Sequence, residues 1–429
     1  MQNQTRTEVL IVEENLKSNL AHFCNFVDGI TAVLTRKGMR VTVAAHQQWR
    51  GSLKDAEVLR LFKYHNGERF LMAKGGVQRV CAAVWHNLVL AVRVAGVLWR
   101  RPRVNLVVAT YINVFHVFGW WLVWAVFGRW KIERLVLNSP CPVWVFDFKP
   151  DGTKYRHSGA GMVGWCYRLF RRAVARGDVL LLSETEHDAA ELSAAAGVEV
   201  RAFDPPRLES MVAAARAIRE QGSAPGAAMI FGWVGQFKVE KGVSCFMEGT
   251  RIFLQDNPTI PCRIRVPWPD DPSICEVSLA ELEAWAASDE RIEWFHRGPV
   301  GEDDDYGETL GRTDCIILPY QKHRYIGRGS STALDGAVAE VPLIVTGETW
   351  MDDLLRTLAA GIAFENGNAN ALAAAMRRMY DEQAYFRSEA RRRGEVARER
   401  LSWTRLAGLL TGESDELAGK PDQAGKASR

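Results

Sequence analysis

The sequence lacks several patterns that would assign it to a common class of protein. Its eight cysteines never form a C-x-x-C pair, which argues against a zinc ribbon and a thioredoxin-like redox site. No G-x-G-x-x-G follows the first predicted strand and no P-loop is present, so a Rossmann dehydrogenase and a P-loop NTPase are disfavoured. The first residues contain no apolar signal-peptide core. Most of the cysteines lie within short apolar segments, which is typical of buried, reduced thiols. We therefore expect a cytoplasmic protein.

An excess of charge of one sign is also missing. The 54 basic and 51 acidic residues leave a net charge of +3, which is too balanced for a dedicated nucleic-acid-binding protein. An apolar content of 47% and a charged content of 24% exclude a disordered chain, a collagen-like repeat and a disulfide-rich miniprotein. The length of 429 residues allows two or three domains. These values are ordinary for a soluble globular enzyme.

Apolar and amphipathic segments alternate along the chain, which predicts an α/β protein. The first strand, over 9–12, is followed by a polar loop, a helix over 20–37 and a strand over 40–45. Further strands are predicted over 104–109, 135–137, 143–146 and 179–182, with a basic helix over 167–176. Apolar strands that alternate with helices indicate a parallel sheet covered on both faces.

A second α/β half follows a segment of small residues and turn formers at 221–226. Its predicted strands are 229–234, 262–266, 292–295, 315–318 and 343–345, and its predicted helices are 243–256, 279–287, 306–312, 332–339 and 368–380. We therefore predict an N-terminal domain over 1–222, a C-terminal domain over 227–392, a helix over 393–411 and a disordered tail over 412–429.

The strongest chemical pattern follows the strand at 229–234. Gly235 and Gln236 begin a loop that ends with Lys241 and Gly242 and opens a helix. Glycines let the backbone approach a phosphate, and the start of a helix presents free N–H groups. Lys241 adds a positive charge for the same anion. The pattern predicts a phosphate site, and a turn with a solvated lysine is the alternative.

A second cluster precedes the helix at 332–339. Ser330 or Ser331 is a good cap for that helix, and Arg328 is placed to pair with a phosphate. Asp335 lies about one turn inside the helix and is a candidate acceptor of hydrogen bonds from ribose hydroxyls. The alternative for Asp335 is an acid that is favoured by the helix dipole.

The two clusters resemble the nucleotide-sugar domain of group-1 (family 4-like) glycosyltransferases of bacterial polysaccharide synthesis. Matching positions are Gly235, Lys241, Gly242, Pro319, Asp335 and Pro342, and Tyr325-x-x-Arg328-x-Ser330-Ser331 resembles a motif of some members. The resemblance is specific over about 229–365 and weaker over 8–45. The sequence departs from the family at Gln236 (usually arginine), Gly327 (usually glutamate), Val338 (usually alanine) and Glu340 (usually glycine).

This resemblance implies a GT-B fold, in which two Rossmann-like domains face a central cleft. It implies transfer of a sugar, with retention, from a nucleotide-diphosphate sugar to a glycan or lipid-linked glycan. The implied donor-binding residues are Gly235, Gln236, Lys241, Gly242, Tyr325, Arg328, Ser330, Ser331 and Asp335, and Lys241 and Arg328 would also stabilise the leaving diphosphate. A nucleotide-sugar epimerase or hydrolase of the same fold and a non-catalytic subunit are the alternatives, the latter suggested by Gln236 and Gly327.

No cofactor, metal or nucleic acid is expected to bind. A D-x-D pattern occurs at 303–305, but an acidic helix start is the favoured interpretation. In the N-terminal half, which we expect to bind the acceptor, His22 is a candidate catalytic base. Four further candidates of equal rank follow predicted strands: Asp147, Lys149, Glu184 and Glu186.

An apolar and basic stretch suggests contact with a membrane. No charged residue lies between Arg103 and Arg129, but the buried strand at 104–109 leaves about 15 residues, too few to span a bilayer. Nine Lys/Arg and one acid lie between Lys74 and Arg134. We expect peripheral binding to anionic lipid at the inner face of the cytoplasmic membrane, with the aromatic residues of 115–124 in the interface. A core helix with solvated arginines is the alternative.

Overall fold

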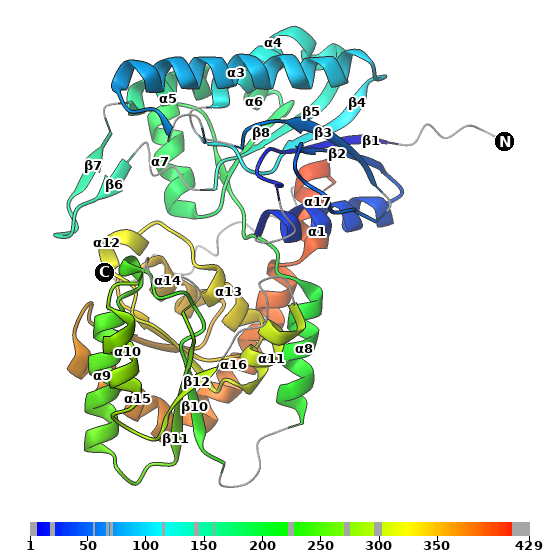
Figure 1. Cartoon of the computed structure of the whole chain (residues 1–429). Coiled ribbons are helices and arrows are strands. Elements are labelled where there is room, and N and C mark those ends of the chain that lie inside the picture. Colours follow the sequence, from blue (N-terminus) through cyan, green and yellow to red (C-terminus); the bar gives the residue numbers. More distant parts are fainter. Residues whose placement is uncertain are drawn as a thin grey trace, which may run out of the picture. The chain divides into compact units, whose positions relative to one another are not determined.

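The computed structural model describes residues 7–17, 22–54, 56–65, 68, 72–113, 116–140, 146–157, 159–221, 227–269, 275–295 and 303–413, without the side chains of His22 and of residues 303–305. The chain forms two compact units (Figure 1). Unit 1 comprises Met1–Asp147, Arg156–Pro206 and Ser402–Arg429, and unit 2 comprises Phe148–Tyr155 and Arg207–Leu401.

Unit 1 contains a seven-stranded parallel sheet in the order β3-β2-β1-β4-β5-β8-β9. The strands are β1 (Glu8–Glu13), β2 (Arg40–His46), β3 (Ala56–Phe62), β4 (Val104–Ala109), β5 (Ile132–Asn138), β8 (Val179–Ser183) and β9 (Arg201–Ala202). Consecutive residues of the central strands are buried, because helices cover both faces of the sheet. A two-stranded hairpin is formed by β6 (Phe146–Phe148) and β7 (Lys154–Arg156), and its central part, Phe148–Tyr155, is assigned to unit 2.

The helices of unit 1 lie in two layers. They are α1 (His22–Arg36), α3 (Gly76–Trp99), α4 (Val117–Lys131), α5 (Ala160–Arg168), α6 (Arg171–Ala175), α7 (Glu186–Ala196) and α17 (Trp403–Thr411). Figure 1 shows α3 and α4 side by side on one face of the sheet, and α1 and α17 on the other. The indole of Trp403 packs so closely on Gly29 of α1 that a Cβ there would overlap it. The C-terminal helix therefore belongs to the core of unit 1.

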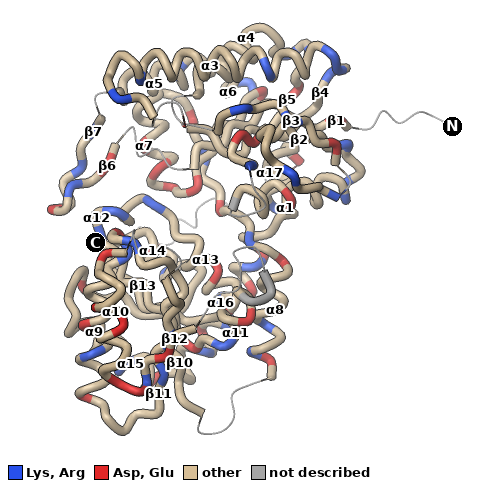
Figure 2. The backbone as a smooth tube through the Cα atoms, viewed as in Figure 1, with Lys and Arg blue, Asp and Glu red and all other residues tan. Residues whose placement is uncertain are grey.

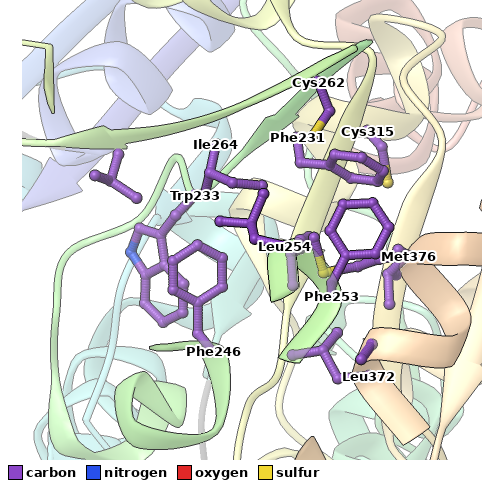
Figure 3. Close-up of a cluster of buried hydrophobic side chains, with 14 of the residues drawn as sticks. Phe231, Trp233, Phe246, Phe253, Leu254, Cys262, Ile264, Cys315, Leu372 and Met376 are labelled. Carbon is purple, nitrogen blue, oxygen red and sulfur yellow. The ribbon is translucent and has the colours of Figure 1, made fainter. Parts of the chain in front are cut away.

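Unit 2 contains a six-stranded parallel sheet in the order β12-β11-β10-β13-β14-β15. The strands are β10 (Met229–Gly232), β11 (Cys262–Pro267), β12 (Ile292–Phe295), β13 (Cys315–Leu318), β14 (Leu343–Thr346) and β15 (Gly361–Phe364). Figure 3 shows one side of its core, where Phe231 of β10 meets Phe253 of the helix at 243–256 with the ring centroids 5.5 Å apart. Buried apolar residues on both faces fix the sheet between its helices.

The helices of unit 2 complete this sandwich. They are α8 (Glu209–Glu220), η2 (Val239–Lys241), α9 (Val243–Asp256), α10 (Leu279–Ala286), α11 (Asp303–Arg312), α12 (Lys322–Tyr325), α13 (Ser331–Val338), α14 (Trp350–Thr357), α15 (Ala369–Asp381) and α16 (Gln383–Arg400). Helix α8 contacts α11 closely, because a Cβ at Gly307 would lie 2.7 Å from the Met211 carbonyl and one at Gly311 would lie 2.6 Å from the Ala215 carbonyl. The segment before the predicted linker thus belongs to unit 2.

Most predicted strands and helices coincide with observed ones, and α11 begins at Asp303, as the acidic helix start predicts. The division of the chain differs from the predicted one in three places. The segment Phe148–Tyr155 belongs to unit 2, the chain enters unit 2 again at Arg207, and the segment from Ser402 returns to unit 1. The predicted strand at 143–146 and the linker at 222–226 fall almost entirely on residues outside the description, as do residues 414–429.

Candidate functional site

Both sheets have the strand order of a doubly wound α/β fold. In unit 1 the order reverses between β1 and β4, and in unit 2 it reverses between β10 and β13. Open α/β sheets bind ligands beyond the carboxyl ends of the strands at this switch point. The loops after β1, β4, β10 and β13 are therefore the places to look for functional side chains.

The loop after β10 places Lys241 in the switch point of unit 2. Gly242 follows with a φ of 70°, in the left-handed region that favours glycine, and begins α9. The Lys241 ammonium lies against the backbone of Gly235, since a Cβ there would be 2.7 Å from Nζ. It also lies 5.1 Å from the ring centroid of Tyr320, the second residue after Leu318 of β13. The loop after β10 and the segment after β13 thus both contact the Lys241 ammonium.

Two tyrosines connect Lys241 to Arg328. The rings of Tyr320 and Tyr325 are 4.6 Å apart, and the Arg328 guanidinium lies 5.5 Å from the Tyr325 centroid. Both rings are buried, and each cation lies over one of them. The structure therefore brings together three of the predicted donor-binding residues, and it adds Tyr320, whose position directly after a strand-ending proline was the available signal.

Two helix starts near these cations differ in charge. Glu276 occupies the start of α9, where its carboxylate accepts hydrogen bonds from the Val243 N–H (2.8 Å) and the Ser244 hydroxyl (2.9 Å). The start of α13 is capped by the neutral hydroxyl of Ser330, which accepts from the Ala333 N–H at 3.3 Å, and Ser331 is its first residue. A bound anion is therefore favoured at α13 over α9, because no carboxylate cap opposes it there.

Asp335 is buried within α13 and already has partners. Its carboxylate accepts a hydrogen bond from Arg207 Nε at 2.6 Å and one from the Tyr306 hydroxyl at 3.1 Å. The ion pair joins α13 to the segment that enters unit 2. Ribose binding by Asp335 stays a prediction, and the geometry adds a structural role to it.

Replacement of Asp335 by alanine should therefore destabilise unit 2. The change leaves the largely buried Arg207 guanidinium without its carboxylate, at a cost of about 3 kcal/mol. Thermal unfolding followed by calorimetry should show a lower transition temperature for Asp335→Ala. The matched variant Asp353→Ala, which removes an exposed carboxylate from α14, should unfold like the parent protein. Equal stability of both variants would contradict the structural role.

A set of aromatic residues that the sequence did not single out lies at the ends of β11 and β12. The rings of Trp268 and Trp294 are 5.3 Å apart, and Phe237 lies 6.4 Å from Trp294. The Arg265 guanidinium lies 5.2 Å from the ring centroid of Phe295. Trp268 follows β11, the neighbour of β10, and Trp294 lies in β12 beyond it. Phe237, which contacts Trp294, belongs to the loop that carries Lys241.

In unit 1, a buried carboxylate joins the loops after β1 and β4. Glu13 accepts a hydrogen bond from the Thr110 hydroxyl at 2.6 Å and two from the backbone and side-chain amides of Asn15, both at 2.8 Å. Burial raises the pKa of Glu13 from 4.5 to about 7, although these hydrogen bonds oppose the shift. The acid therefore titrates near neutral pH at the switch point of this sheet.

This shift predicts that Glu13→Gln stabilises the protein only at high pH. A raised pKa means that the folded state binds the proton of Glu13 more tightly than the unfolded state does. The contribution of protonated Glu13 to the free energy of unfolding is therefore fully present below pH 4.5 and is lost as the pH rises through about 7. Neutral glutamine keeps that contribution, so the variant should gain about 3 kcal/mol at pH 8 and nothing near pH 4. Urea unfolding at both pH values measures this. Glu57→Gln is the control with the opposite sign, since Arg101 lowers the pKa of Glu57.

The remaining residues predicted in the N-terminal half are scattered. His22 begins α1, but its side chain lies outside the description. Asp147 lies in β6, and Lys149 follows that strand in the hairpin turn. Glu184 follows β8, and Glu186 begins α7. Within the described ranges, no group of three or more His, Cys, Asp or Glu side chains is arranged to hold a metal ion.

Helix α3 presents an extended apolar face to solvent. Its exposed apolar residues are Val77, Val80, Val84, Trp85, Leu88, Val92 and Trp99. Figure 2 shows basic residues at the two ends of this helix. Among the described residues, α3 is the one helix that is long and apolar enough to cross a membrane. Its opposite face is buried on the sheet and on α4, where Asn87 accepts a hydrogen bond from the Gly119 N–H.

The aromatic residues that the sequence suggested for a membrane interface are placed differently. Trp120 of α4 is 1% exposed, and Phe115 lies outside the described residues. The prediction is therefore wrong for Trp120, because α4 packs between α3 and α5 and turns this ring into the core. Most of the exposed apolar residues in this layer belong to α3, and a few more lie on α4 (Val126, Trp130) and α5 (Met162, Trp165).

Comparison with known proteins defines the fold. No family model and no curated protein matches the sequence. Among solved structures, an α,α-trehalose-phosphate synthase from Burkholderia xenovorans superimposes with a TM-score of 0.65 at 9% identity over 96% of this chain and 100% of that one. Sucrose-phosphate synthase from Thermosynechococcus elongatus gives 0.62 at 12% identity, over 95% and 98%. The Anabaena protein HepE with UDP-glucose gives 0.58 at 10% identity, over 95% and 99%.

These matches cover nearly the whole of each chain, and they belong to proteins of GT-B architecture. The chain therefore has the GT-B fold, as the sequence predicts. In unit 2 the loop with Lys241 lies at the switch point of the sheet, and in unit 1 Glu13 lies at the corresponding point.

Proposed function

We propose that the protein is a glycosyltransferase that moves a sugar from a nucleotide-diphosphate sugar to a glycan or lipid-linked glycan. The observation that carries this proposal is the arrangement of Lys241 and Arg328 around the paired tyrosines at the switch point of unit 2. Two fixed cations beside the start of α13 suit the charge of a diphosphate. The solved structures of the same fold include synthases described as UDP-forming and HepE with UDP bound.

In the proposed reaction unit 2 mainly binds and orients the donor. The C1–O bond to the diphosphate breaks while the oxygen of the acceptor hydroxyl bonds to C1. The diphosphate leaves with the bonding electrons, and the proton of the acceptor hydroxyl passes to the leaving diphosphate oxygen. Lys241 and Arg328 stabilise the charge that develops on that leaving group. The aromatic residues Trp268 and Trp294 offer flat faces for a nucleobase. Retention at the anomeric carbon is part of the proposal, on the resemblance to group-1 enzymes.

Binding of nucleotides tests the proposal directly. UDP, GDP and ADP should be titrated calorimetrically, followed by the nucleotide sugars of the base that binds. Tight binding together with transfer to an added glycan supports a glycosyltransferase. Consumption of the donor without an acceptor identifies a hydrolase or epimerase instead. Binding without any turnover identifies the non-catalytic subunit that Gln236 and Gly327 suggested. Failure of all diphosphates to bind overturns the proposal.

Peripheral contact with an anionic membrane is a second part of the proposed function. The apolar face of α3 is flanked by exposed arginines, including Arg100 and Arg103 just beyond its end. Because the other face of the helix packs on the sheet, a position along the membrane surface fits α3 better than a span. This surface would hold the protein at the inner face of the cytoplasmic membrane, where lipid-linked acceptors lie.

Charge reversal at Arg100 and Arg103 should weaken membrane binding. Each lost positive charge near anionic lipid removes about 1 kcal/mol, or roughly fivefold in affinity. The parent protein should cosediment with phosphatidylglycerol vesicles at low salt, be partly released at 1 M salt, and bind phosphatidylcholine vesicles little. Arg101 is left unchanged because it pairs with Glu57 at 2.5 Å.

The matched control reverses two exposed arginines of unit 2, Arg377 and Arg378, which pair with acids on their own helix and its end. This control changes the net charge equally and should leave vesicle binding unchanged. If the parent protein ignores anionic vesicles at low salt, or if both double variants lose binding equally, the α3 surface is not a membrane contact.

A further inference from the structure

A small cavity lies in unit 1 between α3 and the carboxyl ends of β1 and β3. Its volume is about 180 Å³, and its lining comes from the loop after β1 (Glu14), the end of β3 (Phe62 and Lys63) and α3 (Trp85, His86 and Arg93). Sites for drug-sized ligands usually measure roughly 300 Å³ or more. The cavity therefore accommodates one end of a larger molecule, at the sheet edge where α/β folds bind ligands.

Two buried polar groups that line the cavity, Glu14 and His86, contact each other but form no hydrogen bond among the described residues. Glu14 Oε2 lies 2.7 Å from His86 Nε2, and both residues are less than a tenth exposed. The approach is close but not aligned as a hydrogen bond, so both atoms are also unsatisfied among the described residues. Buried polar atoms without partners are costly, and a hydroxyl group that both donates and accepts would satisfy this pair.

A second histidine, His116, packs against the ring of His86. The rings of His86 and His116 stack with centroids 3.9 Å apart, and His116 Nδ1 also lacks a partner among the described residues. Burial holds the pKa of His116 well below its usual value, and the adjacent His86 adds to this effect. His116 follows β4 and does not line the cavity itself, but its ring packs on that of His86, which does.

The mouth of the cavity combines positive charge with apolar surface. Lys63 and Arg93 are exposed cations, and Arg93 lies two helical turns beyond His86 on the same face of α3. Trp85 lines the cavity and is also 53% exposed, so its ring connects the cavity to the apolar face of α3. From the Glu14–His86 pair outward, the cavity thus offers buried polar groups, then cations, then apolar surface. A matching ligand carries a hydroxyl, an anionic group and a hydrocarbon chain in that order.

We propose that the cavity binds the head group of a lipid that carries a hydroxyl beside a phosphate ester. The hydroxyl meets the Glu14–His86 pair, the phosphate meets Arg93 and Lys63, and the hydrocarbon continues past Trp85 along α3. That this lipid is the acceptor rests on the proposed function, whereas the binding itself does not.

Soluble short-chain lipids test the proposal on the full-length protein. Dihexanoyl phosphatidylglycerol contains all three chemical features, below its micelle concentration. Dihexanoyl phosphatidylcholine lacks the hydroxyls, and glycerol 3-phosphate lacks the hydrocarbon. Calorimetric titration should show that phosphatidylglycerol binds at least tenfold more tightly than either of the other two. Glycerol 3-phosphate binding as tightly as the lipid would mean a site for free phosphate esters and would overturn the lipid assignment.

Variants locate the binding in the cavity. Arg93→Glu and His86→Ala should each weaken phosphatidylglycerol binding at least tenfold, whereas Arg172→Glu, an equal charge change on α6 of the same unit, should not. Arg93 is exposed, so its replacement does not endanger the fold, and thermal unfolding checks His86→Ala. Unchanged binding in Arg93→Glu, or equal loss in Arg172→Glu, would overturn the proposal. UDP binding in the same samples separates the two hypotheses, since its absence would overturn the proposed function and leave the lipid site intact.

Discussion

Replacing both Lys241 and Arg328 by alanine is expected to abolish measurable binding of a nucleotide diphosphate. Each cation would contribute a charge-assisted hydrogen bond to the diphosphate, worth about 1.5–3 kcal/mol. Each single variant should therefore lose roughly tenfold or more in affinity. The double variant should lose at least a hundredfold, although the two losses need not add because both cations serve one ligand. Calorimetric titration of the nucleotide measures all three variants.

The control for this experiment is Lys322→Ala. Lys322 lies on the short helix that leads to Tyr325, but its ammonium pairs with Glu348 at 2.5 Å and is turned to that partner. Its loss should leave nucleotide affinity within twofold of the parent protein. Unchanged affinity in both single variants at Lys241 and Arg328 would remove the diphosphate assignment from this site. A loss as large in Lys322→Ala would show that only the overall charge of unit 2 matters.

The sequence predicted the parallel cores well because buried strands are continuous apolar runs. Strands such as Cys315–Leu318, with every residue buried, are recognised from composition alone. The strand at Ala56–Phe62 was missed because it alternates exposed and partly buried residues at the edge of the sheet. The return of the C-terminal helix to unit 1 was missed because Trp403 packs on Gly29, a residue that lies near the other end of the sequence. Local patterns contain no information about such a contact.

The donor-side residues could be predicted because they lie within two short segments of the chain. The departures from the family pattern also have local physical reasons. Glu340 stands where the family has glycine, and its φ of 61° shows that the backbone still requires the left-handed conformation. Its ion pair with Arg398 at 2.6 Å offsets part of that strain. The glycine of the family pattern thus reflects a need for a left-handed backbone conformation, which Glu340 adopts in this chain.

The residues of the unit 1 cavity could not be predicted, because three distant segments contribute to it. Glu14 lies in the polar loop after the first predicted strand, but nothing in the sequence connected it to His86 or His116. His86 is one of many residues on an apolar helix, and a histidine on such a helix usually has a structural role. Only the parallel order of the strands brings the loop after β1 and the segment after β4 to the same place.

Replacing Gly242 by alanine is expected to cause the largest loss of stability among these variants. Gly242 has a φ of 70°, a conformation that costs other residues about 1–2 kcal/mol. In addition, a Cβ at this position would overlap the Pro319 carbonyl oxygen, which belongs to rigid backbone after β13. The loop after β10 must then move away from Pro319, so the total cost should exceed about 3 kcal/mol. Calorimetry should show a large decrease in the transition temperature of unit 2.

The same displacement should eliminate nucleotide binding, because Lys241 precedes Gly242 and would lose its position over Tyr320. Gly38→Ala is the matched control: Gly38 has a φ of 81°, but no atom lies within 4 Å of its added Cβ. That variant should show only the conformational cost, a modest shift of the transition, and unchanged nucleotide affinity. Equal destabilisation by the two variants would mean that the contact with Pro319 contributes nothing. In that case, the close approach of the two loops would not be what holds Lys241 in the candidate donor site.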